Sequence, residues 1–114
     1  MANKKVVFIS VPYLKDPERR ERLSLLGVWY VRSQGKTVLR QRQHEYDAVV
    51  EDCKVMLARC DEALFIDGAG GLSNRQRIEL VTAQKLRKEI TITETRTLFD
   101  LVLHAVMDKE VIKV

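Results

Sequence analysis

The chain has 114 residues, of which 46% are hydrophobic and 32% charged, and its formal net charge is +4. This length fits one domain with a single core over residues 1–114, and the composition argues against intrinsic disorder. No run of about 18 apolar residues occurs, and the N-terminus lacks the apolar stretch of a signal peptide. We therefore expect a cytoplasmic protein with no membrane span, and its two cysteines are too few for a disulfide framework.

The first half of the chain predicts a strand, a long helix and a second strand. Asp16 can accept amide hydrogen bonds as an N-cap, and Pro17 suits the first position of a helix. This helix is expected to end at about Ser33, because Gly35 can take the left-handed conformation that stops a helix. Two β-rich runs predict the strands, at residues 5–10 and 37–40.

The second half continues the alternation. Apolar residues at three- and four-residue spacing predict a helix over residues 46–59. Ser73 or Asn74 can cap a third helix that runs to about Arg87, and a fourth helix is expected over residues 97–107. The remaining strands are predicted at residues 63–66 and 89–93, and residues 111–114 predict a fifth short strand or a docked end.

Alternating strands and helices with short connections predict an α/β domain whose parallel sheet is covered on both faces. We expect three layers and a flavodoxin-like or Rossmann-like sheet of four or five strands, in an order such as 2-1-3-4. The helix over residues 17–33 is apolar almost all the way round, so the last helix or a second subunit must cover part of it. Trp29 and Tyr30 are residue types favoured at interface cores, and we expect a homo-oligomer through this helix.

Five cations and no acid lie between Arg22 and Gln43, namely Arg22, Arg32, Lys36, Arg40 and Arg42. One interpretation is a solvated helix end followed by a strand at the edge of the sheet, where cations discourage edge pairing. The other is a patch that faces a polyanion. Trp29 and Tyr30 are adjacent and do not alternate with the cations as base-stacking aromatics would, so we do not expect nucleic acid as a partner.

Ligands of open α/β sheets bind outside the carboxyl ends of the strands, where residues 67–73 form the loop richest in glycine. This loop can bind an anion at the start of a helix, or it is a plain surface loop. Glu79 follows within that helix, either as a nucleophile or base in a pocket, or as an exposed acid paired with Arg75. Cys53 and Cys60 are expected to be buried structural thiols, and no residue spacing suggests a metal or a cofactor.

Three segments carry a resemblance to a known family. Residues 7–13 read Val-Phe-Ile-Ser-Val-Pro-Tyr, residues 60–66 read Cys-Asp-Glu-Ala-Leu-Phe-Ile, and residues 73–79 read Ser-Asn-Arg-Gln-Arg-Ile-Glu. In this order they resemble the nucleoside 2-deoxyribosyltransferase-like superfamily, and most closely a small branch found in bacteria and phages. In that family Gly-Pro usually follows the first strand, and a later helix begins with a Ser/Asp-x-Gly-(Ala/Thr)-x-x-Glu signature. The resemblance covers residues 6 to about 92.

The resemblance implies a nucleoside or nucleotide-like ligand and a reaction at its N-glycosidic bond. Glu79 would be the nucleophile, and Asp67 would be the acid that assists departure of the base. The expected ligand-binding residues are Ser10, Pro12, Tyr13, Gly68, Ser73 and Arg75. The alternative is a non-catalytic module of the same fold that binds a nucleotide-like ligand or a partner protein.

The chain departs from the family pattern at two places. Val11 replaces the glycine before the proline, and Arg75-Gln76 replaces the Gly-Ala of the helix signature. We expect both long side chains at the mouth of the pocket, where they would block a nucleoside or clamp a phosphate. In relatives a second subunit often lends a residue to the pocket, so a homo-oligomer would also complete the site.

Overall fold

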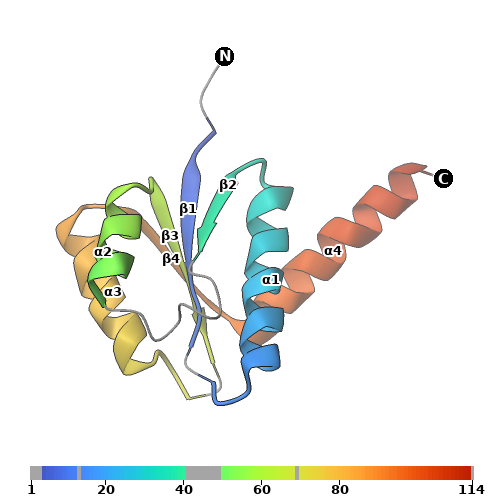
Figure 1. Ribbon diagram of the computed structural model, residues 1–114. Coiled ribbons are helices and arrows are strands. Elements are labelled where there is room, and N and C mark those ends of the chain that lie inside the picture. The colour runs from blue at the N-terminus through green and yellow to red at the C-terminus, as the bar shows by residue number, and fades with distance from the viewer. Residues whose placement is uncertain (1–3, 13, 41–49, 69, 114) are drawn as a thin grey trace.

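The computed structural model describes residues 4–12, 14–40, 50–68 and 70–113 of the chain. Strands and helices alternate through these residues, and each strand is followed by a helix (Figure 1). The strands are β1 (Val6–Ser10), β2 (Thr37–Arg40), β3 (Glu62–Asp67) and β4 (Glu89–Glu94). The helices are α1 (Pro17–Ser33), α2 (Val50–Ala58), α3 (Asn74–Lys85) and α4 (Thr95–Lys113).

The strands form a parallel sheet in the order β2-β1-β3-β4, which confirms the predicted α/β fold. The chain winds outward from β1 to β2 and outward again from β3 to β4, so the direction of winding reverses between β1 and β3. Ser10 at the end of β1 pairs with Phe65 in β3. The carboxyl ends of β1 and β3 therefore lie together, at the position where open α/β sheets bind their ligands.

Helices cover both faces of the sheet and form two hydrophobic cores (Figure 1). Because successive side chains of a strand point to opposite faces, β1 and β3 contribute to both cores. The core under α1 and α4 contains Val7, Ile9, Leu23, Val28, Val31, Leu64, Ile66 and Leu98. The core under α2 and α3 contains Phe8, Cys53, Leu57, Cys60, Ala63, Phe65 and Ala83. Both cysteines are free and buried, as predicted.

Helix α1 begins and ends at the predicted residues. The Asp16 carboxylate accepts a 3.0 Å hydrogen bond from the Glu18 amide, and Pro17 opens the helix. Gly35 follows the helix with a φ of 75°, a conformation that glycine adopts without strain. Gly27 lets α1 approach the sheet closely, because a Cβ at that position would lie only 3.0 Å from Ile66 Cδ1.

Helix α4 corrects one expectation. The structure continues this helix to Lys113, so the predicted fifth strand over residues 111–114 is wrong. No glycine or proline follows Thr95 to break the helix, and α4 therefore runs on past the sheet (Figure 1). Helix α2 is described from Val50, and its expected first turn over residues 46–49 lies outside the described residues.

The apolar surface of α1 is only partly covered. Helix α4 packs against α1, which was one of the two expected ways to cover it. Val28 and Val31 are buried and Tyr30 is partly buried, but Trp29 remains 60% exposed. Whether a second subunit covers Trp29 stays a prediction.

The cationic segment supports the interpretation as a helix end and an edge strand. β2 stands at one edge of the sheet, and three of the five cations face acids. These ion pairs are Arg22–Glu18 at 3.7 Å, Lys36–Glu62 at 3.0 Å and Arg40–Glu21 at 2.9 Å. Arg42 lies outside the described residues. In the described part of the chain, no helix is long and apolar enough to cross a membrane.

Candidate functional site

The structure brings together three of the predicted site residues, Ser10, Arg75 and Glu79, at one cavity. The Ser10 hydroxyl donates a 2.9 Å hydrogen bond to Glu79 Oε1. Ser10 ends β1 and is 2% exposed, while Glu79 lies on α3 and is 6% exposed. The interpretation of Glu79 as an exposed acid is therefore wrong, because α3 turns this side chain toward the sheet.

The start of α3 explains the position of Glu79. Ser73 is the N-cap, and its hydroxyl accepts a 3.3 Å hydrogen bond from the Gln76 amide. The Gln76 side chain in return accepts a 3.0 Å hydrogen bond from the Ser73 amide, which completes a capping box. Ser73, predicted to bind a ligand, thus has a structural role in orienting the helix that carries Glu79.

Gln76 also ties the two central strands together. Its Nε2 donates hydrogen bonds to the carbonyl of Ser10 at 3.2 Å and to that of Ile66 at 2.8 Å. The residue is 0% exposed, so the expectation of Gln76 at the mouth of a pocket is wrong. The capping bond turns the side chain inward, where it satisfies carbonyls at the ends of β1 and β3. The Ser73-x-x-Gln76 spacing is a capping signal that could have located this residue in the sequence.

Arg75 and Cys53 complete the surroundings of Glu79. Arg75 Nη2 donates to Cys53 Sγ at 3.4 Å, and Cys53 on α2 is 1% exposed. Burial raises the pKa of the Glu79 carboxyl, and hydrogen bonds from Ser10 and Cys53 with the charge of Arg75 oppose this rise. Burial raises the pKa of the Cys53 thiol as well, against the hydrogen bond from Arg75. No local sequence signal links Cys53 to Glu79, because the two residues lie on different helices.

The cavity beside Glu79 is small. Its volume is about 20 Å³, which leaves room for about one water molecule. Seven residues line it, namely Phe8, Ile9, Ser10, Val11, Ser24, Arg75 and Glu79. Val11 is thus part of the wall, at the position where the family that the sequence resembles usually has glycine. A ligand that touches Glu79 would have to displace part of this wall.

Asp67 lies in a different hollow from Glu79. It ends β3 and borders a cavity of about 330 Å³ together with Gly68, Gly71, Glu94, Thr95 and Arg96. Asp67 Oδ1 is buried and has no hydrogen-bond partner among the described residues. This cavity shares no residue with the cavity beside Glu79. The structure therefore does not bring the two predicted catalytic carboxyls into one cavity.

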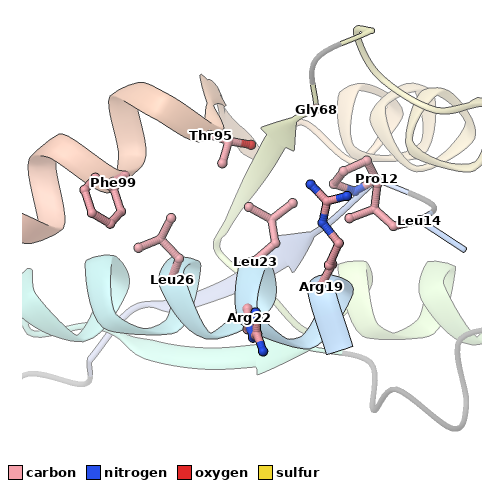
Figure 2. Close-up of a pocket in the computed structure, with 9 residues that line it drawn as sticks. All are labelled: Pro12, Leu14, Arg19, Arg22, Leu23, Leu26, Gly68, Thr95 and Phe99. Atoms are coloured by element: carbon pink, nitrogen blue, oxygen red, sulfur yellow. The ribbon is translucent and has the colours of Figure 1, made fainter. Parts of the chain in front are cut away.

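A third and larger cleft contains two more of the predicted residues, Pro12 and Gly68. It has a volume of about 710 Å³ and lies between α1 and α4 (Figure 2). It is lined by Pro12, Leu14, Arg19, Arg22, Leu23, Leu26, Gly68, Thr95 and Phe99. A Cβ at Gly68 would lie 3.4 Å from Pro12 Cγ, so the segments after β1 and β3 are in contact here. Tyr13 lies outside the described residues.

Comparisons with known proteins add no assignment. Neither the family models nor the curated proteins with which the chain was compared give a match. Among the residues that the structure describes, no three or more His, Cys, Asp or Glu side chains are grouped to hold a metal ion. A functional proposal therefore depends on the chemistry of Glu79 and its neighbours.

Proposed function

We propose that this protein binds a nucleoside- or nucleotide-type ligand at the carboxyl edge of its sheet and breaks the N-glycosidic bond, with Glu79 as the nucleophile. The resemblance of residues 6–92 to the nucleoside 2-deoxyribosyltransferase-like superfamily suggests the ligand class. The observation that carries the chemistry is the burial of Glu79 at 6% exposure, beside the end of β1 and 2.9 Å from the Ser10 hydroxyl.

Burying the Glu79 carboxyl is unfavourable in free energy, and core packing does not explain why this group is buried. Removing a carboxylate from water is unfavourable unless partners replace its hydration. Ser10, Cys53 and Arg75 supply such partners, yet burial still raises the pKa of Glu79. Titratable groups with perturbed pKa values are concentrated at functional sites, which favours a chemical role for Glu79 over a packing role.

The reaction follows from the chemistry of a carboxylate facing a glycosidic carbon. An oxygen of Glu79 forms a bond to the anomeric carbon while the bond from that carbon to the base nitrogen breaks. The electron pair leaves with the base, which takes up a proton from an acid. Water or a second base then attacks the anomeric carbon and gives a proton to the deprotonated acid, and the carboxylate of Glu79 is released. We propose Asp67 as this acid. For Asp67 to protonate the base, the ligand must extend across the ends of β1 and β3.

A second candidate function is binding without turnover, by the same fold. The observation that favours it is the volume of about 20 Å³ beside Glu79, together with the separate cavity of Asp67. A protein that only binds its ligand needs no access to Glu79. The two candidates agree on the ligand class and differ only in whether the base is released.

One pair of assays separates these candidates. The protein is incubated with a panel of nucleosides, deoxynucleotides and nicotinamide dinucleotide, and released base is measured by chromatography. The same panel is tested by thermal shift, since a ligand at a hundred times its Kd stabilises the fold by ~2.7 kcal/mol. Base release supports the enzyme, and stabilisation without base release supports the binding module. Neither signal from any member of the panel would contradict both.

We also propose that the protein forms a homo-oligomer through α1. Trp29 is 60% exposed and Leu25 is 40% exposed on this helix. Leu101 and Leu103 of the neighbouring α4 are 42% and 46% exposed. Exposed aromatic and aliphatic side chains on two packed helices are typical of a surface that a second subunit covers.

A further inference from the structure

The cleft between α1 and α4 has the character of a ligand site separate from Glu79. Its volume of about 710 Å³ falls in the range of small-molecule pockets, roughly 300–1,000 Å³. It shares no lining residue with the cavity beside Glu79. We propose that this cleft binds an amphipathic organic anion, with an aromatic body between the two helices and an acidic group on Arg19. This inference does not rest on the proposed reaction.

The walls of the cleft fit an apolar body. Leu23 and Leu26 project from α1 toward Thr95 and Phe99 on the opposite side (Figure 2). The Phe99 ring is 55% exposed, so one of its sides is available for contact with a planar group. The Thr95 hydroxyl donates a 2.9 Å hydrogen bond to the Asp67 carbonyl, which fixes this end of α4 at the cleft. An aromatic ring held between aliphatic and aromatic side chains gains burial of apolar surface.

Arg19 gives the cleft its charge. Its guanidinium lies beside Pro12 and on the same side of α1 as Leu23, at one end of the cleft (Figure 2). None of the described acids forms an ion pair with Arg19. Asp67, although close in the fold, lines the neighbouring cavity and not this cleft. A guanidinium at the end of an apolar cleft favours an anion over a neutral or cationic ligand, because its planar donors match phosphate and carboxylate oxygens.

Arg32 provides a matched control. It is exposed on the same helix and is not among the residues that line the cleft. Like Arg19, it forms no ion pair with any of the described acids. Changing either arginine to glutamine removes one positive charge and keeps a polar side chain. The two variants therefore change the net charge equally, but only Arg19→Gln removes a guanidinium from the cleft.

The experiment measures two probes that differ in charge. Anilinonaphthalene sulfonate carries an aromatic body and an anion, and phenylnaphthylamine has the same body without the anion. Titration calorimetry gives the Kd and stoichiometry of each probe with the wild type, Arg19→Gln and Arg32→Gln. Competition by naphthyl phosphate and by naphthoate then shows which acidic group the cleft prefers. Phe99→Ala tests the wall, and Trp29→Ala controls for probe bound to the other exposed aromatic residue.

We expect one sulfonate probe to bind per chain. Arg19→Gln should bind it about tenfold more weakly, because the variant loses one charge-assisted hydrogen bond. Arg32→Gln and Trp29→Ala should bind as the wild type does, and Phe99→Ala should weaken both probes. The neutral probe should not respond to Arg19→Gln. Equal effects of the two arginine variants, or no binding of the sulfonate probe by the wild type, would overturn the proposal. All four changes are at exposed side chains, and near-ultraviolet circular dichroism verifies that each variant is folded.

Discussion

Ser10 and Glu79 are 69 positions apart in the chain, and the hydroxyl of one donates a 2.9 Å hydrogen bond to the carboxylate of the other. This contact joins the end of the first strand to the third helix in a buried site. Gln76, one turn earlier on the same helix, holds the Ser10 carbonyl at 3.2 Å. The position of the proposed nucleophile is thus coupled to the junction of β1 and β3.

The raised pKa of Glu79 predicts how stability changes with pH. The folded state holds the Glu79 proton to higher pH than the unfolded state does. The contribution of this proton to the stability of the fold is therefore fully present below the pKa of Glu79 in the unfolded state. That contribution is lost as the pH rises through the folded pKa. Glu79→Gln keeps a group that accepts from Ser10 but cannot ionise. We expect this variant to gain stability over the wild type as the pH rises from acid to neutral.

Urea denaturation across that pH range checks this prediction. Glu89→Gln, at an exposed carboxylate on β4, controls for the general effect of removing one negative charge. If the stability difference between Glu79→Gln and the wild type stays constant with pH, the carboxyl is not perturbed by burial.

Arg75 is predicted to hold down the pKa of Glu79. Its positive charge favours the carboxylate, so Arg75→Gln should raise this pKa further and move the pH dependence of stability to higher pH. Arg77→Gln is the matched control, because Arg77 is exposed on the same helix. The pH series of urea denaturation for the two variants provides the measurement. An identical shift in both would assign the effect to net charge rather than to the site.

We predict that the Gln76 side chain contributes to the free energy of unfolding more than a typical polar side chain does. Gln76→Ala leaves the carbonyls of Ser10 and Ile66 without their buried donor and removes the capping box, which should cost about 2–4 kcal/mol. Gln84→Ala, at an exposed glutamine of the same helix, should change stability by less than about 0.5 kcal/mol. Urea denaturation measures both. Similar small losses would show that the bridge between β1 and β3 is not important for stability.

The proposed oligomer predicts a specific effect at α1. Trp29→Glu places a charge where a second subunit would bury an indole, and we expect it to convert the oligomer to a monomer in sedimentation equilibrium. Val55→Glu, at a residue of α2 that is 51% exposed, should leave the mass unchanged. A monomeric wild type, or an unchanged mass for folded Trp29→Glu, would contradict an interface at this residue.

Local sequence signals predicted the fold well. Asp16, Gly35 and Ser73 mark helix ends through capping chemistry that depends on a few neighbouring residues, and each cap lies where it was expected. The strand order is the one expected of a flavodoxin-like or Rossmann-like sheet. The end of α4 was missed, because Val111 and Ile112 suit a strand or a helix and no breaker precedes them.

The candidate site was predictable only in part. The contact of Ser10 with Glu79 agrees with the idea that the carboxyl edge collects polar groups. The inward turn of Gln76 and the separate hollows of Glu79 and Asp67 depend on how side chains pack between helices and strands. No spacing along the chain encodes that packing. The same holds for the cleft of Arg19, whose walls come from two helices that meet only in the fold.

The central claim is that Glu79 attacks the anomeric carbon of a nucleoside-type substrate. The most direct measurement is mass spectrometry of acid-quenched protein, after incubation with the panel member that releases base. We predict a pentosyl adduct on the peptide that contains Glu79, absent in Glu79→Gln, whose rate of base release falls by at least about a thousandfold. Base release that continues at the wild-type rate in Glu79→Gln, without any adduct on this peptide in the wild type, would contradict the account.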